Sequence, residues 1–135
     1  MRATIAVAAS ASALLLVSCG TSDHGKHATG SAKQVGDTVS ALQRDLLTRN
    51  WADICNVLFS SQARAQAGGQ AGCQAFVSRG AGDLRGARIR VRKIEVHAPN
   101  ATADVMTTAQ GQAPVPATIQ FVLEQGRYRI SALGG

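Results

Sequence analysis

The stretch RIRVRKIEVH, residues 88–97, decides the fold of this chain. In its first half Ile89 and Val91 alternate with arginines, and from Ile94 onward the apolar residues continue on the opposite parity. A period of two is typical of a β-strand with one buried face. The change of parity after Arg92 predicts a β-bulge, because one extra residue returns the apolar side chains to the buried face.

Three further strands are expected downstream of this one. Pro99-Asn100 marks a turn, residues 109–116 carry two prolines and a glycine and mark a hairpin loop, and Gln125-Gly126 marks a tight turn. Together with the first strand they predict an antiparallel meander. The additional strands are expected at residues 101–108, 119–124 and 128–130.

Upstream of residue 88 the apolar residues follow a helical period instead. Val35, Val39, Leu42 and Leu46 form one stripe and predict a first helix, capped near its start by Asp37 or Thr38 and ending at Asn50. Helices followed by strands predict the α+β class, with the N-terminal helices packed on one face of a curved antiparallel sheet. Shorter helices are expected at residues 51–58, 60–66 and 70–78.

The N-terminus has the pattern of a bacterial lipoprotein signal peptide, expected at residues 1–18. Arg2 is its single charge, and the apolar run from Ile5 to Val17 is shorter than the ~20 residues that a membrane-spanning helix needs. The sequence LLLVSC that ends at Cys19 resembles a lipobox. We expect cleavage before Cys19 and a diacylglycerol and palmitate anchor on its sulfur, which would place the protein on the extracytoplasmic face of the cell membrane. The alternative is an ordinary secretory signal with an incidental cysteine.

Residues 19–34 are expected to be the lipidated cysteine and a flexible tether, because they contain almost nothing apolar. His24 and His27 lie in this segment and are expected to be solvated rather than metal ligands. The folded domain is then expected at residues 35–135.

Composition and charge limit the classes of partner that this protein is expected to bind. The net charge is +6 and aromatic residues make up 4% of the chain. A basic domain beside a membrane is attracted to anionic head groups. Nucleic acid is not expected, because the chain is predicted to be exported and has few aromatic side chains on which bases could stack.

Cys55 and Cys73 remain once Cys19 is assigned to the lipid. Two cysteines in an exported domain favour a disulfide. Free thiols or a metal pair are the alternatives, but neither cysteine has a neighbouring histidine to complete a zinc site.

Several segments resemble the nuclear transport factor 2-like superfamily, which includes SnoaL and ketosteroid isomerase relatives, and in particular actinobacterial lipoproteins of that fold. They are NWADIC at residues 50–55, LFS at 58–60, Cys73, and EQGRYRI at 124–130. The resemblance covers about residues 35–133. It implies a cone-shaped, cystatin-like arrangement of three helices against a bent sheet with a pocket between them. Some members are isomerases, dehydratases or cyclases and many are non-catalytic, so the fold alone does not settle function.

The resemblance also indicates which residues to consider as candidate site residues. Related enzymes use an Asp or His base with a Tyr or an acid in the cone. No such pair has a catalytic spacing here, so we predict no catalytic residue, no metal and no cofactor. The residues of those types are Asp53, His97, Asp104 and Tyr128. The residues expected to line the pocket are Trp51, Phe76, Phe121 and Tyr128.

A row of basic residues is the remaining feature. Alternate residues of a strand project from one face about 7 Å apart, so such a row can bind phosphates, lipid head groups or an acidic partner. The alternative is a solvated face that discourages aggregation at a sheet edge. Arg127 and Arg129 share one parity on the last strand and would widen the row if the two strands lay in one sheet. The row comprises Arg85, Arg88, Arg90, Arg92 and Lys93.

The sequence therefore predicts a membrane-anchored, non-catalytic domain that binds a small apolar ligand or an envelope protein. An enzyme of the ketosteroid isomerase or dehydratase type is one alternative. Electrostatic association with anionic envelope components through the basic row is the other.

Overall fold

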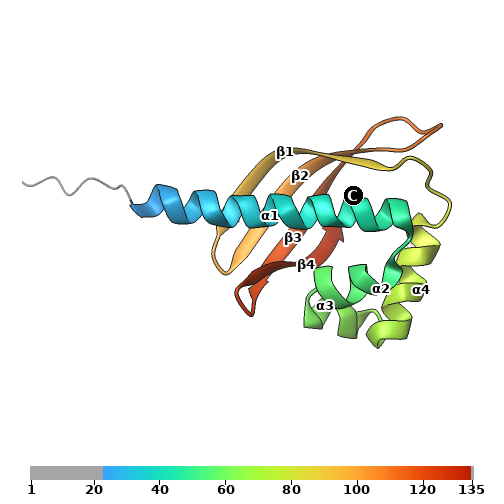
Figure 1. Cartoon of the computed structure of the whole chain (residues 1–135), viewed down its shortest axis with the longest axis horizontal. Coiled ribbons are helices and arrows are strands. Elements are labelled where there is room, and N and C mark those ends of the chain that lie inside the picture. Colours follow the sequence, from blue (N-terminus) through green and yellow to red (C-terminus); the bar gives the residue numbers. More distant parts are fainter. Residues whose placement is uncertain (1–22, 135) are drawn as a thin grey trace, which may run out of the picture.

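The computed structural model describes residues 23–134 and shows helices packed on a four-stranded antiparallel sheet with strand order β1-β2-β3-β4 (Figure 1). The predicted α+β class and the meander are confirmed. Cys19 and the expected signal peptide lie outside the described residues. The helical segments are α1 (Asp23–Thr48), α2 (Trp51–Asp53), the π-helical turn η1 (Ile54–Leu58), α3 (Ser61–Gln66) and α4 (Gly69–Ala81). The strands are β1 (Arg88–His97), β2 (Asn100–Thr108), β3 (Val115–Glu124) and β4 (Arg127–Gly134).

The predicted β-bulge is present in β1. The pairing of β1 with β2 shifts register between Val91 and Lys93. Because the extra residue falls there, Ile89 before the bulge and Ile94 after it both pack against the core. The parity change in the sequence therefore marks one continuous strand rather than two.

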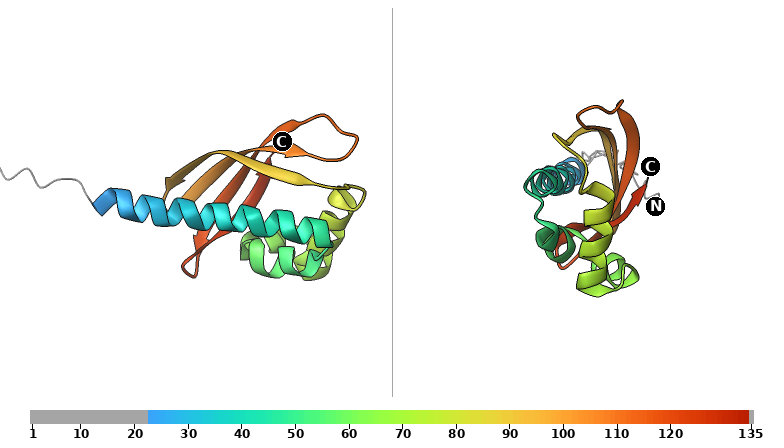
Figure 2. Two further views of the ribbon diagram at one scale, coloured as in Figure 1. Left: turned by 45° about the horizontal axis from the view of Figure 1, so that its top comes forward. Right: turned by 90° about the vertical axis from the view of Figure 1, so that its right-hand side faces the viewer.

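The core lies between α1 and the concave face of the sheet. Val35, Val39 and Leu42 of α1 are buried in one cluster with Ala103 and Phe121 of the sheet. Figure 2 shows the helices on the inner side of the curved sheet. Burial of each large apolar side chain contributes roughly 1.5–3 kcal/mol, so this stripe is what holds α1 to the sheet.

The first helix begins earlier than the sequence predicts. α1 starts at Asp23 and so includes part of the segment expected to be a flexible tether, and Asp37 lies inside the helix rather than capping it. The Asp37 carboxylate forms an ion pair at 2.7 Å with the amine of Lys33, which lies one turn earlier in the helix. Once the packed stripe has nucleated a helix, each added residue costs little, and Lys33 and Gln34 are good helix formers.

The helix ends and caps follow local chemistry. Arg49 after α1 adopts a left-handed φ of 57°, and the Asn50 side chain accepts a hydrogen bond from the Asp53 amide at 3.4 Å, so Asn50 caps α2. The Ser60 hydroxyl accepts from the Ala63 amide at 3.1 Å and caps α3, as its place in the sequence suggests.

Cys55 and Cys73 form the predicted disulfide. The S–S distance is 2.02 Å, the Cα atoms are 5.9 Å apart, and both side chains are buried. The bond joins η1 to α4 and so fixes the short helices to one another at one end of the sheet.

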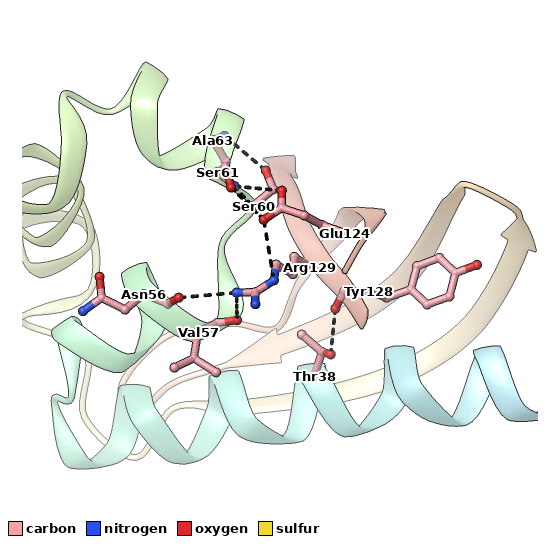
Figure 3. Close-up of polar contacts among 9 residues, drawn as sticks. All are labelled: Thr38, Asn56, Val57, Ser60, Ser61, Ala63, Glu124, Tyr128 and Arg129. Carbon is pink, nitrogen blue, oxygen red and sulfur yellow. Dashed lines mark hydrogen bonds and ion pairs between the residues drawn. The ribbon is translucent and has the colours of Figure 1, made fainter. Parts of the chain in front are cut away.

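A polar clamp joins the closing hairpin to the helices (Figure 3). Nη1 of Arg129 donates to the carbonyl oxygens of Asn56 and Val57 at 3.3 and 2.8 Å, while the Glu124 carboxylate accepts from the amide and hydroxyl of Ser61 at 3.0 and 2.7 Å. Arg129 and Glu124 also form an ion pair at 3.7 Å. A cation thus meets the carbonyl end of η1 and an anion meets the amide end of α3, as helix dipoles favour.

Candidate functional site

A cavity of about 290 Å³ lies between the helices and the concave face of the sheet. Its inner wall includes the buried side chains of Ile54, Val105 and Ile119. Its lining also includes Phe76 of α4 and Leu133 of β4, which remain 55% and 49% exposed. The cavity therefore combines a buried apolar wall with large apolar side chains that still meet solvent.

The lining of this cavity is almost entirely apolar. Among the described residues that line it, Thr107 alone has a side-chain nitrogen or oxygen, and its hydroxyl already donates to the Val115 carbonyl at 3.0 Å. A ligand inside would be held by shape and apolar contact rather than by hydrogen bonds.

A second hollow of about 310 Å³ adjoins the first on the side of α3. Phe59, Phe76 and Leu133 line both. These three side chains form the partition, so a movement of the exposed Phe76 or Leu133 side chain would change the space available on both sides.

The predicted pocket residues separate into two groups. Phe76 lines the cavity as expected, but Trp51, Phe121 and Tyr128 line neither the cavity nor the adjoining hollow. Phe121 and Tyr128 are core residues, 1% and 4% exposed, because α1 closes over their half of the sheet. Thr38 of α1 donates to the Tyr128 carbonyl at 3.1 Å and marks that contact (Figure 3).

Most of the lining carries no signal in the sequence. The helical stripe identified Leu42 as a core position, and the strand pattern identified Ile119, but neither pattern shows which core positions border empty space. That depends on where α1 and α4 separate, which is a tertiary property.

The acids and bases considered for catalysis lie away from this cavity. Asp53 is in α2, His97 is exposed at the end of β1, and Asp104 is exposed on β2, where it accepts from the Thr118 hydroxyl at 2.9 Å. None of them, nor Tyr128, lines the cavity.

Asp45 is a buried carboxylate that the sequence patterns did not single out. It is 1% exposed and pairs with Nε of the adjacent Arg44 at 3.0 Å, while its second oxygen has no hydrogen-bond partner. Its position between Leu42 and Leu46 of the apolar stripe was the available signal.

The basic row lies on β1, which is an edge strand, except for Arg85, which lies in the connection before it. Lys93 is neutralised by Glu95 at 2.7 Å, whose hydrogen bond raises the pKa of Lys93. Across the strand pair, Arg88 and Arg90 face the uncharged residues Thr108 and Met106. No carboxylate in the described part of the chain lies within ion-pairing distance of four of the arginines, which are Arg85, Arg88, Arg90 and Arg92.

The row is not widened by the last strand. β4 occupies the opposite edge of the sheet from β1. Arg129 is committed to the clamp with Glu124 and the η1 carbonyls rather than to a basic surface. The two strands do lie in one sheet, but Arg127 and Arg129 do not extend the row because β2 and β3 lie between them and β1.

Residues 23–134 include no helix with the length and apolar character needed to cross a membrane. In the same range, no group of three or more His, Cys, Asp and Glu side chains is placed to hold a metal ion.

No protein-family model and no curated protein matches this chain. Among solved structures, a de novo designed NTF2 fold protein, NT-9, is similar with a TM-score of 0.41 and 16% sequence identity, over 75% of this chain and 81% of that one. The α+β fold class of this chain rests on its own sheet order and helix packing.

Proposed function

We propose that this protein is a lipoprotein of the extracytoplasmic membrane face whose nuclear transport factor 2-like domain binds a small apolar ligand and performs no chemistry. The apolar cavity between the helices and the sheet carries the proposal. Its volume of about 290 Å³ is near the lower end of the roughly 300–1,000 Å³ of small-molecule sites.

The exposed apolar residues of the lining support a binding role. Phe76 and Leu133 expose large apolar side chains beside an apolar cavity. Such exposure carries a hydration cost that a ligand would remove on binding, at about 25 cal/mol per Å² of apolar surface. The lining offers no carboxylate, imidazole, amine, thiol or phenol to act as acid, base or nucleophile, which favours binding over the enzymatic alternative.

The anchoring part of the proposal rests on sequence and on the disulfide. The lipobox resemblance ends at Cys19, and the Cys55–Cys73 bond fits an oxidising, extracytoplasmic compartment. A diacylglycerol and palmitate anchor on Cys19 follows from the lipobox, and the export that it requires is consistent with the disulfide.

The anchor is tested by membrane fractionation of a bacterial host that produces the full chain. Cys19→Ser should move the protein from the membrane fraction to the released fraction, whereas Ser18→Ala, which keeps a small residue before the cysteine, should leave it membrane-bound. Retention of the Cys19→Ser chain on membranes would refute the lipid anchor.

The cavity is tested by titrating the full Cys19→Ser chain, free of detergent, with the apolar fluorophore N-phenylnaphthylamine. Ala81→Trp fills the lining from α4 and should abolish the fluorescence increase. Ala75→Trp adds the same ring on the exposed side of α4 and is the matched control. Equal binding by both variants would contradict the proposal.

Electrostatic association through the basic row is a second candidate, because four of its arginines lack a carboxylate partner in residues 23–134. Arg88→Glu with Arg90→Glu should weaken binding of the Cys19→Ser chain to phosphatidylglycerol vesicles in sedimentation assays. Arg79→Glu with Arg127→Glu makes the same charge change at other exposed positions and serves as control. Vesicle binding that does not respond to salt would exclude this candidate.

A further inference from the structure

The apolar cavity shares a wall with a polar groove. Leu46 at the end of α1 and Leu84 in the connection from α4 to β1 line both spaces. The groove has a volume of about 600 Å³, and its lining includes Arg49, Arg85 and Gln110. An apolar compartment and a basic compartment therefore lie side by side at one end of the domain.

The two arginines are well placed and uncommitted. Arg49 directly follows α1, and its amide donates to the Leu46 carbonyl at 3.3 Å. The Arg85 carbonyl accepts from the Gln110 amide at 2.8 Å, which fixes its connection against the loop between β2 and β3. Within the described residues neither guanidinium has an ion pair or hydrogen bond.

The groove is basic despite the helix that ends beside it. The C-terminus of α1 contributes about half a negative charge through its free carbonyl groups. Arg49 and Arg85 each contribute a full positive charge to the lining, and no carboxylate lines the groove. The net positive charge of the groove therefore favours the binding of an anion.

Among the described lining residues the cavity offers an anion no free side-chain donor, because the Thr107 hydroxyl already donates to the Val115 carbonyl. Burial of a charged or hydrogen-bonding group there would be costly. A ligand with a polar end must place that end outside, and the groove across Leu46 and Leu84 is lined by Arg49 and Arg85. Arginine side chains bind carboxylate or phosphate oxygens strongly.

We infer that the ligand is a single-chain amphiphile with an anionic head group, whose chain occupies the apolar cavity and whose head group binds Arg49 and Arg85. The inference rests on the proposed ligand-binding function and specifies its ligand class. The cavity of about 290 Å³ suits one chain rather than two. Leu46 and Leu84 contact the chain where it leaves the cavity.

The test is isothermal titration calorimetry of the full Cys19→Ser chain, free of detergent, with two probes, dodecanoate below its critical micelle concentration and dodecanol below its solubility limit. Dodecanoate carries the anionic head group, and dodecanol has the same chain without the charge. Dodecanoate should bind at least about tenfold more tightly, since a charge-assisted hydrogen bond contributes on that scale.

Arg49→Gln with Arg85→Gln should remove this advantage, reducing dodecanoate affinity about tenfold and leaving dodecanol unchanged. Arg79→Gln with Arg127→Gln removes two exposed arginines elsewhere and should change neither. Circular dichroism and thermal unfolding establish that each variant is folded.

Equal affinities for the two probes, or full dodecanoate affinity in the Arg49→Gln, Arg85→Gln variant, would overturn the inference while the apolar cavity function stands. Failure of both probes to bind the folded chain would overturn the cavity function and the inference with it.

Discussion

Loss of the disulfide between Cys55 and Cys73 should lower the free energy of unfolding by about 3 kcal/mol. The two residues are 18 apart in sequence. For a loop of that length the chain-entropy relation gives about 11 cal/mol/K, or about 3 kcal/mol at 25 °C. Domains of this kind are stable by only about 5–15 kcal/mol, so the bond supplies a large share of the margin.

The assay measures the urea unfolding of the oxidised and of the reduced protein, with circular dichroism as the signal. The Cys19→Ser chain is unfolded, reduced and refolded in reductant, because both sulfurs are buried and inaccessible in the native state. The melting temperature should fall by about 12–24 °C, from roughly 4–8 °C per kcal/mol for small domains.

The double variant Cys55→Ala, Cys73→Ala should lose at least as much as reduction does, because it also removes two buried sulfur atoms. Coincident unfolding curves for the oxidised and reduced chains would refute the chain-entropy reasoning. A larger loss in the double variant than on reduction measures the packing of the sulfurs alone.

Three other substitutions test the packing and the polar contacts by urea denaturation. Phe121→Ala should cost about 3–5 kcal/mol because it empties a fully buried site, and a loss below about 1 kcal/mol would contradict its place in the core. Gln43→Leu should cost about 1 kcal/mol, since the Gln43 carbonyl accepts from the Ile89 amide at 2.7 Å; an unchanged midpoint would show that water replaces the contact. The Ser61 hydroxyl, and to a smaller extent the Ser61 amide, donates a hydrogen bond that lowers the pKa of Glu124. The ionised Glu124 therefore stabilises the fold fully above the ordinary glutamate pKa, and this stabilisation is lost as the pH falls through the lowered pKa of the folded state. Glu124→Gln should flatten that acid limb, and an identical pH dependence in both proteins would exclude the clamp as its source.

The strand half of the fold could be predicted because its signals are local. The parity change after Arg92 is written in consecutive residues, and it corresponds to the register shift between Val91 and Lys93. The cysteine pair was predictable because removal of Cys19 from the count leaves only one pairing. The period of the apolar residues and the number of cysteines can both be read from the sequence without tertiary information.

The start of α1 and the cavity lining could not be predicted in the same way. Helix propagation ahead of Val35 depends on a nucleus formed by packing, and the residues there are polar. Phe76 and Phe121 have the same side chain, yet one borders the cavity and the other is fully covered. The difference arises from where α1 lies over the sheet.

Arg129 illustrates a third limit. Its parity suggested a surface arginine, but its guanidinium reaches the carbonyl groups of Asn56 and Val57, more than seventy residues earlier in the chain. Carbonyl groups at the end of a helical turn leave no residue-type signal, so such a partner appears only when the chain is folded.

The early start of α1 has a mechanical consequence. From Asp23 to Gln34 the chain is helical, and twelve residues in this form span about 18 Å. A coil of the same length would have a similar average span, about 19 Å, but no fixed direction. A rigid arm instead sets orientation: α4, which contributes Phe76 and Ala81 to the cavity lining, lies at the end of α1 opposite Asp23 (Figure 1), so an attachment at the Asp23 end holds α4 at the far end of the domain.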